Sequence, residues 1–172
     1  MKSLTCRLFL LFFSFLICLG GCKQERSGGP LMAGDEAPDF MARDLEGDII
    51  VLSNLEGKPV IVRFWETNCK FCKADTPLFN QYYGEYQDKG LSIVYVSAFY
   101  EQRPAVDEYI RQLEIEFQVV MDADARLADL FSVKVYPQTF MIGPDRRIIA
   151  TLFGGVGEAE FEELLGEYLT EN

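Results

Sequence analysis

The feature that most restricts the fold of this 172-residue chain is a short segment of β-branched and aromatic residues at positions 59–65. Because it is apolar at nearly every position rather than at alternate ones, it is typical of a strand covered on both faces. A second run of this kind follows at 91–97. Two such strands separated by a helical segment predict a parallel pair in a sheet with helices on both faces.

The other segments complete an α/β domain with a mixed sheet. A helix is expected to begin at Cys69 and to continue through residues 76–88. The proline at position 104 opens an amphipathic helix. Hairpins across the turns at 44–47 and 143–145 add antiparallel strands. Further elements are a strand at 118–121 and helices at 125–131 and 161–168.

The N-terminal segment predicts export. Lys2 and Arg7 precede a 12-residue apolar run at 8–19, which has the length of a signal-peptide core and is short for a membrane span. The Leu-Gly-Gly-Cys sequence that ends at Cys22 resembles the lipobox of bacterial lipoproteins, whose cysteine is lipidated. An ordinary signal peptide and an uncleaved anchor are the alternatives. We expect a lipoprotein signal peptide at 1–21, a flexible tether at 22–33 and a folded domain at 34–172.

Composition removes several kinds of site. Histidine is absent, which excludes Ser-His-Asp triads, Cys-His dyads and His-ligated zinc. The formal net charge of −11 argues against a nucleic-acid partner, because such proteins need a basic face. If the signal peptide is removed and Cys22 carries lipid, two thiols remain, too few for a four-thiolate zinc site. We expect no metal and no cofactor. The cysteines are Cys6, Cys18, Cys22, Cys69 and Cys72.

Cys69 and Cys72 stand three residues apart at the predicted start of a helix, just after the buried strand. This spacing places both on one side of the helix, at a separation that suits a disulfide. The helix N-terminus and Lys70 would stabilise a Cys69 thiolate. A purely structural disulfide is the alternative, although such a bridge gains more from closing a long loop. The pattern favours a redox-active dithiol in an oxidising compartment.

Several ordered motifs resemble a known family. They are GDEAPDF at 34–40, GKPVIVRFW at 57–65, Pro77 and VKVYPQTF at 133–140. With the C-x-x-C pair, they make the chain similar to the thioredoxin-like, TlpA/ResA-type, membrane-anchored thiol–disulfide oxidoreductases, which are related to the AhpC/TSA group. The resemblance implies a thioredoxin fold, with a central mixed β-sheet, helices on both faces and an N-terminal β-hairpin extension.

The resemblance also implies roles for the reacting residues. Cys69, nearer the helix end, is expected to be the exposed nucleophile, and Cys72, one turn further in, the resolving thiol of a redox disulfide. Asp75 stands where ResA-type proteins carry a Glu that handles protons near the thiols. One helical turn beyond Cys72, its side chain could reach the site, and the alternative is a solvated helix acid.

Three more residues become candidates for substrate binding. In the family, the proline at the position of Pro137 is cis and faces the disulfide. The backbone of Tyr136 would then pair with an extended client segment, as in strand addition. Trp65 would pack beneath the active site.

The chain departs from the family pattern at several positions. Asn68 replaces the Trp that usually precedes the first cysteine, and the dipeptide between the cysteines is Lys70-Phe71. Arg63 occupies the position of a buried Asp in thioredoxins proper. It would pair with a carboxylate or extend outward to water. These departures leave the direction of electron transfer open.

The function that the resemblance implies is an envelope thiol–disulfide oxidoreductase, foremost a protein-disulfide reductase, in cytochrome c maturation or redox homeostasis. An oxidase or isomerase is the alternative. A peroxiredoxin-type peroxidase is less favoured, because it would need a Thr three residues before its cysteine and this chain has Glu66 there. An SCO-like copper chaperone is also less favoured, because it needs C-x-x-x-C and a His, and this chain has C-x-x-C and no His. The implied partners are protein thiol or disulfide clients, a DsbD/CcdA-type membrane electron donor and, through the lipid, a membrane on its periplasmic or extracytoplasmic side.

Overall fold

The structure is a computed structural model, and it describes residues 29–170. The predicted signal peptide at 1–21, the lipidation of Cys22 and most of the predicted tether lie outside the described residues. Within the described part, no helix has both the length and the apolar character needed to cross a bilayer.

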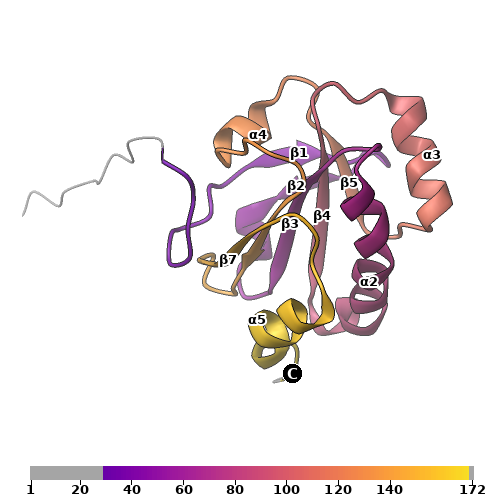
Figure 1. Cartoon of the computed structure of the whole chain (residues 1–172). Coiled ribbons are helices and arrows are strands. Elements are labelled where there is room, and N and C mark those ends of the chain that lie inside the picture. Colours follow the sequence, from indigo (N-terminus) through magenta and orange to yellow (C-terminus); the bar gives the residue numbers. More distant parts are fainter. Residues whose placement is uncertain (1–28, 171–172) are drawn as a thin grey trace, which may run out of the picture.

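A five-stranded mixed sheet forms the centre of the domain, in the order β5-β4-β3-β6-β7 (Figure 1). β3 lies in the middle, parallel to β4 and antiparallel to β6. All six residues of β3 are buried, as its unbroken apolar sequence predicts. The strands are β3 (Val60–Trp65), β4 (Ser92–Ser97), β5 (Gln118–Met121), β6 (Gln138–Ile142) and β7 (Ile148–Phe153).

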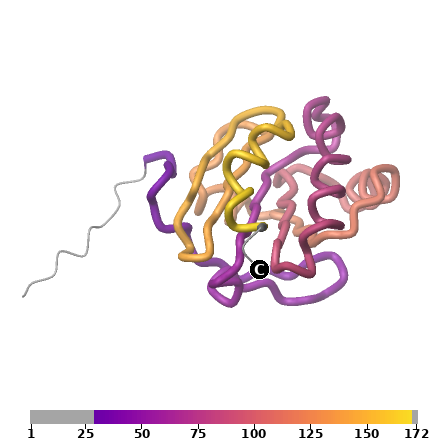
Figure 2. The backbone as a smooth tube through the Cα atoms, turned by 90° about the horizontal axis from the view of Figure 1, so that it is seen from below, coloured from indigo at the N-terminus to yellow at the C-terminus, as the bar shows by residue number. Residues whose placement is uncertain are grey.

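Helices cover both faces of this sheet, which confirms the predicted fold class. One face packs against three helices, and the buried rings of Phe79, Tyr109 and Phe161 join Trp65 there. These helices are α2 (Lys70–Tyr86), α3 (Arg103–Leu113) and α5 (Glu158–Thr170). In the tube view of Figure 2, α2 and α5 run near each other over the sheet, and Phe79 of α2 contacts Phe161 of α5 at 5.0 Å between ring centroids.

The opposite face is covered by the short helix α4 (Arg126–Leu130) and by the N-terminal hairpin of β1 (Met41–Arg43) and β2 (Ile49–Val51). The hairpin confirms the predicted extension. Phe131 at the end of α4 packs between Phe40, Phe64 and Phe140. Short 3-10 helices at Leu52–Leu55 and Gln87–Lys89 complete the described elements. Gly90 ends the second with a φ of 103°, a conformation that glycine adopts without strain.

Candidate active site

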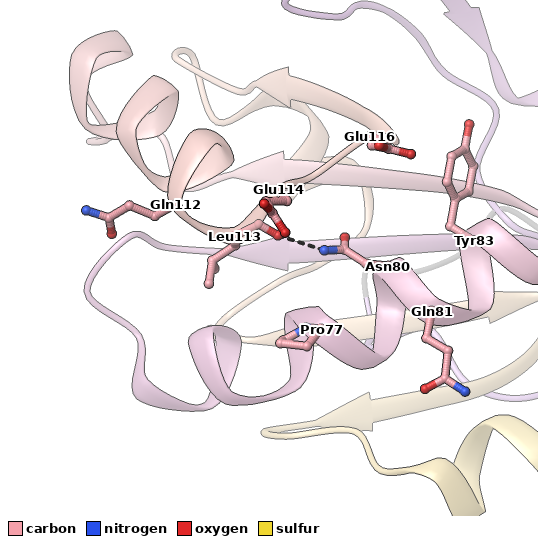
Figure 3. A pocket seen from close by; sticks show the side chains of 8 residues that line it. All are labelled: Pro77, Asn80, Gln81, Tyr83, Gln112, Leu113, Glu114 and Glu116. Atoms are coloured by element: carbon pink, nitrogen blue, oxygen red, sulfur yellow. Dashed lines mark hydrogen bonds between the residues drawn. The ribbon is translucent and has the colours of Figure 1, made fainter.

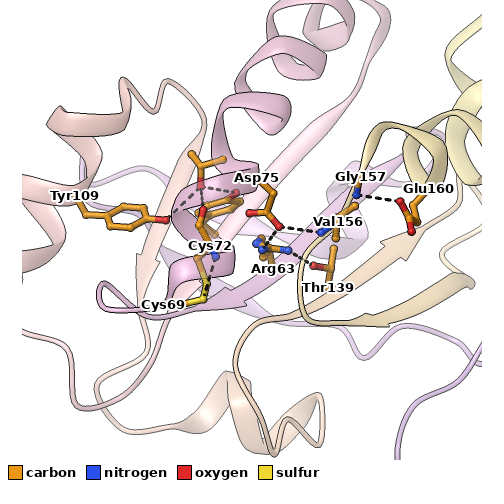
Figure 4. A network of polar contacts seen from close by, with 11 residues as sticks. Arg63, Cys69, Cys72, Asp75, Tyr109, Thr139, Val156, Gly157 and Glu160 are labelled. Carbon is orange, nitrogen blue, oxygen red and sulfur yellow. Dashed lines mark hydrogen bonds and ion pairs between the residues drawn. A yellow bond between two sulfur atoms is a disulfide. The ribbon is translucent and has the colours of Figure 1, made fainter.

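Cys69 and Cys72 form a disulfide at the start of α2 (Figure 4). Cys69 is the N-cap of the helix, with an extended backbone, and its Sγ accepts the N–H of Cys72 at 3.0 Å. The two Cα atoms are 5.2 Å apart, within the range that a disulfide requires. Because α2 follows β3 after a short loop, the disulfide lies at the carboxyl edge of the central strand.

Both cysteines are largely buried, and this corrects the expectation of an exposed Cys69. Cys69 is 6% exposed and Cys72 is not exposed at all. The reason is that both pack into the aromatic cluster beneath α2 instead of lying on the helix surface. Cys69 is nevertheless the more accessible of the two.

Trp65 lies in this same cluster, and its role in substrate binding stays a prediction. Its side chain has no exposed surface, because the ring packs against Tyr109 with centroids 4.3 Å apart and against Tyr95 at 5.9 Å. Trp65 therefore packs in the buried cluster that also contains both cysteines, as the resemblance implied.

The peptide bond between Tyr136 and Pro137 is cis, the conformation implied by the family motif. Gln138, the next residue, pairs with Phe64 near the end of β3, so this turn lies at the same edge of the sheet as the loop before Cys69. The carbonyl of Pro137 accepts the N–H of Gly154. Tyr136 is half-buried, with its ring 6.2 Å from that of Tyr100.

A buried ion pair lies beside the disulfide. Nη2 of Arg63 contacts Oδ2 of Asp75 at 2.6 Å, and Nη1 donates to the hydroxyl of Thr139 at 2.6 Å (Figure 4). The backbone N–H of Val156 donates to the same Asp75 oxygen at 2.9 Å. Arg63 has no exposed surface and Asp75 is 8% exposed. Asp75 is therefore no solvated helix acid, and Arg63 does not extend outward, because the two charges compensate each other inside the core.

Burial raises the pKa of Asp75 above its ordinary value, while the Arg63 charge and the hydrogen bond from Val156 act to lower it. The guanidinium of Arg63 also lies over the ring of Phe79, 4.7 Å from its centroid. Such a cation–ring contact helps a charged group to reside away from water. The ion pair is thus held in place by contacts with Thr139, Val156 and Phe79.

A hydroxyl cluster lies below Cys72. The Thr76 hydroxyl donates to the Cys72 carbonyl at 2.5 Å and lies 3.3 and 3.2 Å from the hydroxyls of Tyr95 and Tyr109. Burial raises the pKa of both tyrosines, to about 12 for Tyr109. These groups stay neutral at working pH and bind the first turn of α2 to the core.

Two contacts hold the loop in front of Cys69. The carboxylate of Glu101, 9% exposed, accepts the N–H of Thr67 at 2.8 Å and its hydroxyl at 2.9 Å. In the second contact, the hydroxyl of Tyr100 donates to the carboxylate of Glu66. Sequence reasoning missed both contacts, because residues 34 positions apart meet only when β3 and β4 pair.

Large apolar side chains are exposed around this edge of the sheet. Phe71 is 63% exposed between the two cysteines, and Phe99 and Tyr100 follow β4 directly. Val135 precedes the cis proline, and Phe153 is paired with Gln138 at the end of β7. We call Phe71, Phe99, Tyr100, Val135 and Phe153 the apolar rim. An exposed apolar surface of this kind is typical of a protein-binding site.

A pocket of about 540 Å³ lies between α2 and the end of α3, away from the cysteines (Figure 3). Its lining mixes polar and apolar side chains, and the Asn80 amide donates to the Leu113 carbonyl across it. Within the described residues, no group of three or more His, Cys, Asp or Glu side chains is placed to hold a metal ion.

Residues 33–151 match the AhpC/TSA family. Over 136 residues the chain is 35% identical to the thiol-disulfide oxidoreductase ResA of a Bacillus cereus strain, covering 79% of this chain and 76% of that protein. Identity to ResA of Bacillus subtilis (strain 168) is 32%, with coverage of 77% and 73%.

Solved structures show the same fold. The thioredoxin domain of a thiol-disulfide oxidoreductase from Bacteroides vulgatus superposes with a TM-score of 0.70 at 23% identity, over 81% of this chain and 99% of that one. A thioredoxin-family thiol:disulfide interchange protein from Chlorobium tepidum TLS gives 0.69 at 22% identity, over 84% and 99%.

Proposed function

Because the chain belongs to the AhpC/TSA family and is a thioredoxin-like thiol–disulfide oxidoreductase of the ResA type, we propose that it reduces disulfides in exported proteins through Cys69 and Cys72. The observation that carries the proposal is the pair itself: a disulfide at a helix N-terminus, with one sulfur nearer to solvent than the other. Apocytochrome c and other exported thiol proteins are the clients we propose.

Cys69 is the nucleophile in this proposal. The Cys72 N–H, the helix N-terminus and neighbouring Lys70 stabilise its thiolate. The thiolate attacks a client disulfide, forms a mixed disulfide and expels one client thiolate, which takes a proton from water. Cys72 then loses its proton to Asp75 and attacks Sγ of Cys69. The internal disulfide forms and the second client thiol leaves, so that two electrons pass from protein to client.

The apolar rim and the cis-proline turn are the client surface in this proposal. The rim residues are exposed at the edge of the sheet where Cys69 lies, and the backbone at Tyr136 offers an edge for an extended client segment. An exposed apolar rim favours clients that are not yet folded, because these present apolar side chains.

The proposal also covers where the protein is located and how it is kept reduced. The N-terminal sequence supports attachment to the outer side of a membrane through lipid on Cys22, in the periplasm or its extracytoplasmic equivalent. In an oxidising compartment a reductase works only if it is itself kept reduced. We infer a membrane electron donor of the DsbD/CcdA type, which would return two electrons to the Cys69–Cys72 disulfide after each cycle.

The reduction potential tests the proposed direction. Phe71 supplies no charge to the Cys69 thiolate, unlike the His in the dipeptide of strong oxidants, so we expect a potential of about −200 to −280 mV. Equilibration of the purified protein in glutathione buffers measures it. A value near that of DsbA, about −120 mV, would refute a reductase and favour the oxidase alternative.

A further inference from the structure

Arg63 is the charged residue of the central strand, and nothing in thiol exchange itself requires it. It stands in β3, six residues before Cys69, and its side chain has no exposed surface. Its two Nη atoms have different partners, Asp75 and Thr139. A buried guanidinium is costly unless an anion compensates it, so the site is built around the ionised form of Asp75.

The second oxygen of Asp75 is left without a partner. Oδ2 accepts from Arg63 and from the Val156 N–H, but Oδ1 is buried and has no hydrogen-bond partner among the described residues. Asp75 follows Cys72 by one helical turn, and both side chains face the buried side of α2 (Figure 4). The unpaired oxygen is thus a proton acceptor on the same side of the helix as the buried sulfur.

We propose that Arg63 is a positioning residue of the exchange reaction, which holds Asp75 ionised with Oδ2 occupied, so that Oδ1 remains available for the proton of Cys72. This inference rests on the proposed function. In the resolving step, the Cys72 thiol gives its proton to Oδ1, its sulfur attacks Sγ of Cys69, and the client leaves as a thiolate that water protonates. Electrons balance, because one disulfide forms as another is lost.

The groups that face Asp75 from each neighbouring element support this assignment. β3 contributes Arg63, and the loop after β7 contributes the Val156 N–H. β4 and α3 contribute Tyr95 and Tyr109, whose hydroxyls stay neutral because burial raises their pKa. Burial is already the largest influence on the Asp75 pKa, and without Arg63 the lowering by its charge would be lost, so the pKa would rise further. Asp75 would then keep its proton to a higher pH, and over that range Oδ1 could not accept the proton of Cys72.

Two titrations of the same variants test the inference. The first follows the Asp75 carboxyl by infrared spectroscopy in the oxidised protein, as the difference from Asp75→Asn. The second follows the pH dependence of reduction of a model disulfide. In Arg63→Met the midpoint of both should rise by about 1–3 pH units. Arg63→Lys, which keeps the charge, should restore most of the wild-type profile. Arg111→Met is the matched control, since Arg111 lies exposed on α3 and pairs with Glu108.

Variants that lack the Asp75 carboxyl distinguish an effect of Arg63 through Asp75 from a direct effect of Arg63 on the exchange reaction. Arg63→Met/Asp75→Asn should have the same exchange profile as Asp75→Asn, and this comparison stands even if Arg63→Met alone does not fold. The inference would be overturned if Arg63→Met folds but its Asp75 carboxyl titrates with the wild-type midpoint. It would also be overturned if Arg63→Met changed the pH profile of exchange in the Asp75→Asn background. Failure of the proposed function would appear differently, as a wild type that reduces no disulfide at any pH, and the infrared titration does not depend on that activity.

Discussion

The carboxylate of Glu101 accepts hydrogen bonds from Thr67, from its backbone N–H at 2.8 Å and from its hydroxyl at 2.9 and 3.1 Å. One residue lies in the loop after β4 and the other in the loop between β3 and Cys69. The contact joins the carboxyl ends of two neighbouring parallel strands at the point where the disulfide lies. A nearly buried carboxylate therefore positions the segment that leads into the active-site helix.

Glu101→Gln should lower the free energy of unfolding by about 1.5–3 kcal/mol, the value of hydrogen bonds to a charged group. Thr67→Val removes only the hydroxyl and should cost about 1 kcal/mol. Urea denaturation measures both. Glu108→Gln on the exposed surface of α3 is the control, with an expected change within about 0.5 kcal/mol. Equal stability of Glu101→Gln and Glu108→Gln would show that the contact contributes nothing.

Asp75→Asn should change how stability depends on pH. Because the Asp75 pKa is raised from 3.8 in the folded protein, the native state binds more protons than the unfolded chain between these two values. The stabilisation from this group is fully present below its unfolded pKa and is lost as pH rises through the folded pKa. The stability of wild type relative to Asp75→Asn should therefore fall as pH rises above about 4. Denaturation at several pH values measures this difference, and a constant difference would contradict it.

At pH values where Asp75 is ionised, Arg63→Met should destabilise the protein by about 3–5 kcal/mol, since it leaves a buried carboxylate without its partner. The double variant Arg63→Met/Asp75→Asn should recover part of this loss, because neither group is then charged and unpaired. A double-mutant cycle from urea denaturation measures the coupling. Arg103→Met, which breaks an exposed pair with Asp107, is the control. Strictly additive losses would mean that Arg63 and Asp75 contribute independently.

The two cysteines should differ in their ability to trap clients. Cys72→Ser leaves the more accessible thiol without a resolving partner, so mixed disulfides should accumulate. Cys69→Ser should trap little, because the remaining sulfur of Cys72 is fully buried. Non-reducing electrophoresis followed by mass spectrometry measures the adducts. Trapping by Cys69→Ser alone would reverse the assigned roles.

Cys22→Ala should release the protein from membranes or block its processing. Lipid chains on this residue would supply the membrane affinity, which a single chain gives only marginally and several give firmly. Membrane fractionation and the intact mass of the mature N-terminus measure the effect. Wild-type protein without lipid mass, and fractionation that Cys22→Ala leaves unchanged, would exclude the anchor.

Patterns that repeat along the chain were enough to predict the elements. The apolar run around Phe64 predicts the central strand, and the periodicity that includes Val106 and Tyr109 predicts α3, because local sequence reports which face of an element is buried. The position of Cys69 at a helix start is also local information. The cis bond before Pro137 followed from a family motif rather than from physics alone.

The order of strands and helices, the location of the dithiol and the chemistry left to a chain without histidine can all be predicted from the residues alone. Tertiary structure alone decided that Arg63 meets Asp75, that Glu101 holds Thr67 and that Trp65 is sealed from solvent. The physical reason is that hydrophobic periodicity identifies a buried face, whereas the partner of a buried charge depends on which elements pack together. Those contacts form only when α2 lies across β3 and β3 pairs with β4.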